Sequence, residues 1–293
     1  DVYTIESVTG PQNFYQAIWD TGGTDEISYS GAADSLIDLR PATLEVEEGG
    51  GGFVSVISTV RGGFTIANDV VIENASSGTG DDTLVGNDAA NELDGGDGAD
   101  TLEGGAGADT LTGGAGTDIA AYAFATSRVR VDLSGGIAGL GDAVGDTFSG
   151  IEGISGSGFN DILLGDNSGN SVAGGGGADR LFGRNGNDLL TGDEGDDDLR
   201  GNNGDDTLEG GADNDRLEGA GGADTLRGGI NDDLLIGGSN GDLLDGGDGF
   251  DVASYQTARV GIRLDLSGTL LANGDARGDV FVDVELRSHV LFL

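Results

Sequence analysis

Aspartate side chains recur at a spacing of nine residues through much of this sequence. In residues 95–118, GGDGADTLEGGAGADTLTGGAGTD, the aspartate that ends one glycine-rich stretch is followed nine residues later by the next. Carboxylate and main-chain carbonyl oxygens are the hard ligands that Ca²⁺ prefers. The chemistry that this spacing predicts is therefore the binding of calcium ions at a series of similar sites.

The pattern is G-G-x-G-x-D-x-U-x, in which U is aliphatic, and it holds without a gap over 77–121 and over 156–254. We call these segments block one and block two and number the positions of each unit from 1 to 9. Position 6 is the predicted carboxylate ligand, and it is aspartate in all but two of sixteen units. The residues are Asp82, Asn91, Asp100, Asp109 and Asp118 in block one, and Asp161, Asn170, Asp179, Asp188, Asp197, Asp206, Asp215, Asp224, Asp233, Asp242 and Asp251 in block two.

Glycine at positions 1, 2 and 4 permits positive φ and lets carbonyl groups converge. We therefore predict main-chain ligands at positions 2 and 4, represented by Gly96, Gly98, Gly105, Gly107, Gly175 and Gly177. Sites that use Asn91 or Asn170 should be weaker, because each has one carboxylate fewer.

Position 8 is leucine or valine in fourteen units and is predicted to face inward. Ordering nine residues costs roughly 9–18 kcal/mol of backbone entropy, whereas one buried leucine returns only about 1.5–3 kcal/mol. The stacked carboxylates also repel one another, so a divalent cation between coils would add its binding free energy to folding. An acidic, glycine-rich chain is otherwise typical of a disordered tail, but such a tail does not hold one frame for 99 residues.

The nonapeptide resembles the calcium-binding repeat of RTX proteins. That resemblance implies an all-β fold, a parallel β-roll in which six residues of each unit turn, three form a strand, and two units complete an 18-residue coil. Neighbouring coils would then pair unit n with unit n+2. This pairing gives three sites in block one and nine in block two, or about twelve Ca²⁺.

The remaining segments are predicted to be β connectors and caps, at 1–76, 122–155 and 255–293. The last two align without a gap at an offset of 133, which matches Tyr122 with Tyr255 and Asp132 with Asp265. The stretches IWDTGGTDEISYSG, IDLRPAT and IANDVVIENASSGTGDDTLVGN resemble the start of the C-terminal domain of serralysin-type secreted metalloproteases. The resemblance implies one further Ca²⁺ site, carried by Asp20, Gly22, Gly23, Asp25 and Glu73; the alternative is that WDTGGTD is only a turn.

Composition excludes most catalytic chemistry for this chain. It has no cysteine and no lysine, and its one histidine is His289, so neither a H-E-x-x-H zinc site nor a Ser–His–Asp triad can be built. The formal charge of −40 argues against nucleic acid and anionic lipid as partners. No apolar run is long enough to span a membrane, and the first residues do not form a signal peptide.

We therefore predict a non-catalytic, calcium-folded β-roll region of a secreted, extracellular bacterial protein. The resemblance implies export by a type I secretion machinery, and a serralysin-like protease as the parent protein. A structural surface protein is the first alternative, such as an S-layer, adhesin or filament subunit, which would self-associate. The second is the accessory roll of another secreted enzyme, such as a lipase or an epimerase.

Overall fold

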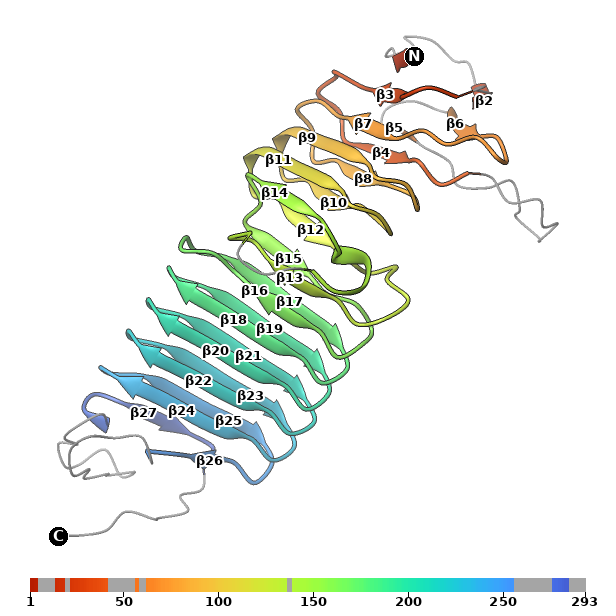
Figure 1. The fold of residues 1–293 in the computed structure, drawn as a ribbon. Coiled ribbons are helices and arrows are strands. Elements are labelled where there is room, and N and C mark those ends of the chain that lie inside the picture. Colours follow the sequence, from red (N-terminus) through yellow and green to blue (C-terminus); the bar gives the residue numbers. More distant parts are fainter. Residues whose placement is uncertain are drawn as a thin grey trace, which may run out of the picture. The chain divides into compact units, whose positions relative to one another are not determined.

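The computed structural model describes residues 1–4, 14–18, 22–41, 56–57, 62–135, 139–255 and 276–284. It divides into two compact units, one formed by 1–126 with 135–153 and one by 127–134 with 154–293. Block one lies in the first unit and block two in the second. Each unit is described by itself (Figure 1).

The first unit consists of short strands stacked in parallel. One stack has the order β1-β3-β7-β9-β11-β14, a second has β5-β4-β8-β10-β12, and β2 pairs with β6. Only the β4–β5 pairing is antiparallel among the pairings that the structure describes here. The strands are β1 (Val2–Thr4), β2 (Phe14–Ile18), β3 (Glu26–Ser28), β4 (Ser35–Asp38), β5 (Val56–Ile57), β6 (Gly62–Ile66), β7 (Asn74–Ser76), β8 (Thr83–Val85), β9 (Glu92–Gly98), β10 (Thr101–Glu103), β11 (Thr110–Gly116), β12 (Ile119–Ala121) and β14 (Thr147–Ser149).

The second unit holds two facing stacks, β13-β16-β18-β20-β22-β24-β26 and β15-β17-β19-β21-β23-β25-β27. Successive nonapeptides alternate between the stacks, as Figure 1 shows for β16 to β25. The strands are β13 (Arg130–Asp132), β15 (Gly153–Ser155), β16 (Ile162–Leu164), β17 (Ser171–Gly176), β18 (Arg180–Asn185), β19 (Leu189–Glu194), β20 (Asp198–Asn203), β21 (Thr207–Ala212), β22 (Arg216–Gly221), β23 (Thr225–Ile230), β24 (Leu234–Ser239), β25 (Leu243–Asp248), β26 (Val252–Ala253) and β27 (Val280–Val282).

The register confirms the predicted coil of two units. Leu190 lies opposite Leu208 in the β19–β21 pair, and Leu208 lies opposite Leu226 in the β21–β23 pair, each step being 18 residues. Strand pairing is more extensive than the three residues per unit that we expected. It continues past position 9 into positions 2 and 3 of the next unit, as in Asp193↔Gly211, because successive turns repeat the same positive-φ backbone at position 2 and so stack in register.

Position 8 forms the core of both blocks. Every leucine at this position from Leu84 to Leu244 has 0% exposure, and each contributes about 1.5–3 kcal/mol on burial. Within the described residues the helical conformations are a 3₁₀ turn, η1 (Gly141–Ala143), and one further 3₁₀ residue, Ala276. Neither is a candidate membrane span. The fold is therefore an all-β parallel β-roll, as the sequence predicted.

Candidate metal centre

The position-6 side chains form a hydrogen-bonded ladder along each edge of the roll. Except in the last turns of each block, the backbone N–H of a position-6 residue donates to Oδ1 of the position-6 aspartate one coil later. Asp188 donates to Asp206 at 2.9 Å, and Asp206 donates in turn to Asp224 at 2.9 Å. The pairs of unit n and unit n+2 that the sequence analysis proposed are thus brought together in both blocks.

The second carboxylate oxygen, Oδ2, has a different environment. Among the described residues, eleven position-6 aspartates have a buried Oδ2 without a hydrogen-bond partner: Asp100, Asp109, Asp118, Asp179, Asp188, Asp197, Asp206, Asp215, Asp224, Asp233 and Asp242. Leaving a buried carboxylate oxygen unpaired costs far more free energy than leaving it in water. These oxygens therefore mark positions at which a cation would be stabilising.

Position-1 glycines show which other oxygen is close to Oδ2. A Cβ atom added to Gly192 would overlap Oδ2 of Asp197 and lie 2.5 Å from the carbonyl oxygen of Gly210, one coil later. The same arrangement recurs at Gly210, next to Asp215. A carboxylate oxygen and a main-chain carbonyl oxygen thus face one point from successive coils, and glycine at position 1 leaves that point open.

The glycines that we predicted as main-chain ligands have positive φ, as expected. Gly96 and Gly98 have φ of 98° and 146°, and Gly175 and Gly177 have 98° and 112°. Gly105 and Gly107 are similar, at 90° and 149°. The sequence did not single out the position-1 carbonyls, although those of Gly210 and Gly228 lie close to an aspartate Oδ2. The signal that could have found them is that position 1 is almost always glycine, although its backbone does not require positive φ.

Burial raises the pKa of these carboxyl groups, and charge repulsion from neighbouring aspartates adds to the effect. The pKa rises to about 6 at Asp188 and Asp224, to about 7 at Asp197, and to about 8 at Asp215. In block one, burial raises the pKa of Asp109 to about 7. Protons and cations would therefore compete for the same oxygens near neutral pH.

The first turn on each edge of a block is closed by protein groups instead. Ser157 donates its N–H and its hydroxyl to Oδ2 of Asp161 at 2.7 and 2.8 Å. The amide oxygens of Asn91 and Asn170 likewise accept an N–H from position 2 of their own turn. Asn91 also donates its Nδ2 to the carbonyl of Glu73 at 2.8 Å, which explains why an amide replaces the carboxylate there.

Connector residues that the repeat pattern did not indicate end the ladder of each block. Asp109 donates its N–H to Asp146 at 2.9 Å, and Asp242 donates to Asp279 at 3.1 Å. The hydroxyl of Tyr122 donates to the other oxygen of Asp146 at 2.8 Å, and Tyr255 makes the equivalent bond to Asp279. The 133-residue offset also relates Asp146 to Asp279, so the duplicated connector carried the signal.

A second ladder, at position 5, was also missed. Asn187 Oδ1 accepts the N–H of Asp205 at 3.0 Å, and Asp205 Oδ1 accepts the N–H of Ala223 at 2.8 Å. In this exposed ladder the acceptor side chain precedes its donor, whereas at position 6 it follows. The available signal was Asn or Asp at position 5 in six of the eleven units of block two.

The N-terminal site implied by resemblance is only partly described, because Asp20 lies outside the described residues. Gly22 and Gly23 have φ of 110° and 143°. The Cα of Gly23 faces the carboxylate of Asp25, whose Oδ2 is buried without a partner, and the N–H of Asp25 donates to Glu73 Oε2 at 2.9 Å. Gly23, Asp25 and Glu73 are thus close together, and their role as ligands stays a prediction.

Carboxylates alone do not make these centres. In the part of the chain that the structure describes, no three acidic, histidine or cysteine side chains are grouped closely enough to hold a metal ion. The available oxygens are one carboxylate Oδ2 per turn together with main-chain carbonyls. That donor set fits calcium, which accepts six to eight oxygen ligands in flexible geometry.

Comparisons with known proteins agree with this architecture. The sequence model of the family described as "Peptidase M10 serralysin C terminal" matches residues 1–265. The chain is similar to the serralysin of Photorhabdus laumondii, with 38% identity over 94 residues, which are 32% of this chain and 17% of that protein. It is 38% identical over 104 residues to the serralysin of Proteus mirabilis, covering 32% and 19%. It is 35% identical over 78 residues to the metallopeptidase AprA of Pseudomonas marginalis, covering 26% and 14%. The matched stretch thus spans less than a fifth of each of these relatives.

Proposed function

Because this chain belongs to the peptidase M10 serralysin C-terminal family, we propose that it is the non-catalytic, calcium-folded β-roll of a secreted, serralysin-like metalloprotease. The observation that carries the proposal is the row of buried Oδ2 atoms without a hydrogen-bond partner, several of which, such as that of Asp197, face a main-chain carbonyl of the next coil. Bound calcium would supply positive charge at these points. The family match favours a protease region over the surface-protein and lipase or epimerase alternatives.

The proposed number of ions follows from the same row of oxygens. Eleven Oδ2 atoms in the described residues are buried without a partner, and Asp251 has its Oδ2 in the equivalent place against Gly246. Together they match the three pairs of block one and the nine of block two. About twelve Ca²⁺ in the rolls is therefore the stoichiometry that we propose.

The role of the repeat residues in folding is thermodynamic. The Oδ1 atoms satisfy backbone N–H groups, while the Oδ2 atoms bring a set of like charges into a buried row. At low calcium concentration this repulsion and the thin leucine core would leave the chain unfolded and able to pass through a type I secretion machinery. Extracellular calcium modules commonly have affinities of about 10⁻⁴–10⁻³ M, so the chain would fold outside the cell.

Circular dichroism with calorimetry tests this function. In EDTA we expect a mostly unordered far-UV spectrum, and a cooperative gain of β signal as Ca²⁺ approaches millimolar. Mg²⁺ should be a poor substitute because it keeps its waters and demands octahedral geometry. A chain that stays fully folded in EDTA, or that binds fewer than about half the proposed ions, would contradict the proposal.

A further inference from the structure

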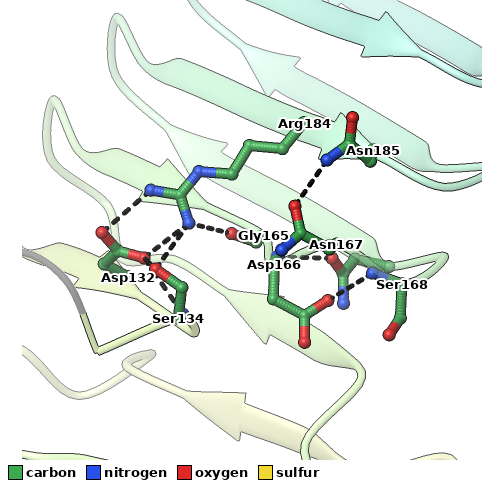
Figure 2. Close-up of polar contacts among 9 residues, drawn as sticks. Asp132, Ser134, Gly165, Asp166, Asn167, Ser168, Arg184 and Asn185 are labelled. Carbon is green, nitrogen blue, oxygen red and sulfur yellow. Dashed lines mark hydrogen bonds and ion pairs between the residues drawn. The ribbon is translucent and has the colours of Figure 1, made fainter.

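Arg184 makes a set of contacts that no other repeat residue in the described part of the chain makes. It occupies position 2 of its unit with φ of 85°, where glycine is usual. Its Nη1 donates to Asp132 Oδ1 at 2.7 Å, to Ser134 Oγ at 2.9 Å and to the Gly165 carbonyl at 2.6 Å. Its Nη2 donates to Asp132 Oδ2 at 2.9 Å. Figure 2 shows the guanidinium reaching back from its own turn, past the turn that contains Gly165, to the connector.

The carboxylate at the centre of these contacts is buried. The side chain of Asp132 is 1% exposed, against 26% for Arg184. Burial alone would raise the pKa of Asp132, but hydrogen bonds from Arg184 and Ser134 lower it below its usual value. Asp132 is therefore ionised, and the guanidinium supplies the compensating charge.

The Gly165 carbonyl belongs to the same series as the carbonyls of the metal centres. Gly165 is position 1 of the first turn on its edge of block two. On the opposite edge of block two the position-1 carbonyl lies close to Oδ2 of the aspartate one coil earlier, as Gly210 does to Asp197, and on the edge of Gly165 the Gly183 carbonyl lies close to Asn170 Oδ1. Before Gly165 the stack holds the connector strand β13 instead of a repeat, since Leu133 donates its N–H to the Leu164 carbonyl at 3.0 Å. Next to β13, the Gly165 carbonyl accepts a hydrogen bond from Arg184.

Block one has an arginine–aspartate pair at the equivalent level, with both residues in the connector. Asp38 lies opposite Val85 in the β4–β8 pair, and Asp132 lies opposite Leu164 in the β13–β16 pair. Val85 and Leu164 both occupy position 9 of the first unit of their block. Arg40 donates its Nε to Asp38 Oδ1 at 2.9 Å and its Nη2 to Asp38 Oδ2 at 2.6 Å. The turn that follows has asparagine at position 6 in both blocks.

We propose that the first level on this edge of each block is closed by an arginine–aspartate pair in place of calcium, so that each roll has a metal-independent N-terminal cap from which calcium-dependent coils are added. A guanidinium is permanently charged and matches a carboxylate with two parallel hydrogen bonds. In a stack whose stability is a sum over neighbouring coils, a preformed end spares the first coil the cost of nucleation. The inference rests on the proposed calcium-dependent folding of the rest of the block.

Hydrogen exchange of the full chain tests the cap, with Arg184→Gln as the variant. Arg227→Gln is the matched control, because Arg227 is an exposed arginine of the same block whose Nη1 donates to Glu209 at 2.8 Å. In EDTA, the parent and the control should protect peptides covering 130–134 and 162–166 at least about tenfold more than mid-block peptides, which corresponds to about 1.4 kcal/mol. Arg184→Gln should lose this protection while its calcium stoichiometry stays that of the parent.

Other outcomes would overturn the cap. Equal behaviour of the two variants, or no protection of the parent cap in EDTA, would refute it. So would loss of one calcium ion in Arg184→Gln, because the arginine would then support a metal site. If Arg184→Gln does not fold even in calcium, Arg184→Lys is compared with Arg227→Lys, and equal cap protection in that pair refutes the proposal. If EDTA does not lower the protection of mid-block peptides, the proposed calcium function is contradicted. The cap would still be tested by whether Arg184→Gln protects the peptides covering 130–134 and 162–166 less than Arg227→Gln does.

Discussion

Asp206 and Asp161 occupy the same position of the repeat, yet the structure predicts that they contribute to stability in different ways. Oδ2 of Asp206 is buried without a partner, whereas Oδ2 of Asp161 accepts two bonds from Ser157. Replacement by asparagine keeps Oδ1 as an acceptor and removes the charge. Asp206→Asn should therefore remove one calcium ion from the folded state, and Asp161→Asn should remove protein hydrogen bonds and no ion.

The dependence of unfolding free energy on calcium concentration separates the two effects. An ion that binds only the folded state adds about 1.4 kcal/mol of stability for each tenfold rise in free Ca²⁺ above its dissociation constant. For Asp206→Asn the slope of this plot should fall by about 1.4 kcal/mol per decade. For Asp161→Asn the slope should equal that of the parent, while the whole line drops by about 1.5–3 kcal/mol, the range for a hydrogen bond to a charged group.

Urea unfolding at several fixed calcium concentrations measures both slopes. The midpoint of a calcium titration would be a poor substitute: a loss of about 2 kcal/mol shared by nine cooperatively bound ions shifts it only about 1.5-fold. An unchanged slope for Asp206→Asn would refute the assignment of Oδ2 to calcium. A reduced slope for Asp161→Asn would show that the first turn of block two also holds an ion.

Three further predictions follow from single contacts. The buried carboxyl groups have a pKa of about 6–8 in the folded form, against about 3.9 unfolded, so the folded form binds more protons. In EDTA, the β signal in circular dichroism should therefore increase as pH falls from 8 to 5. A flat profile would contradict the burial of these groups. Gly192→Ala should destabilise the roll in thermal unfolding by about 1–3 kcal/mol, because the added Cβ would overlap Asp197 Oδ2. Gly158→Ala is the control: its added Cβ would have no atom within 4 Å, so its stability should stay within about 0.5 kcal/mol of the parent. Tyr122→Phe should lower the unfolding free energy of block one by about 1.5–3 kcal/mol by removing the bond to Asp146, and an unchanged value would mean that water replaces the hydroxyl.

Periodicity made the roll predictable from the sequence. The frame kept over block two predicts the inward leucines from spacing. The 18-residue coil, and with it the pairing of Asp188 with Asp206, came from the resemblance to the RTX repeat. The expected strand length was too short, because glycine-rich turn residues were assumed not to pair. In the structure they do, as Asp193 shows by lying opposite Gly211.

What the sequence did not reveal depends on contacts that break the period. Asp146 closes the ladder of block one from a connector in which no nine-residue frame exists. Arg184 departs from the glycine consensus, and its partner Asp132 is 52 residues away. Which oxygen of each aspartate remains unpaired also depends on the stacking of successive coils, since Oδ1 is taken by a backbone N–H of the neighbouring turn.

The two oxygens of each position-6 carboxylate therefore have separate tasks. Oδ1 accepts a backbone N–H and so fixes the register of one coil on the next, with or without a cation. Oδ2 makes no protein hydrogen bond in eleven described units and contributes mainly a buried charge. Calcium would consequently change the free energy of the stack without changing its pairing. A sequence that encodes one register can thus be unfolded at low calcium and still reach a single fold when calcium rises, because the ion neutralises charge while the main chain selects the structure.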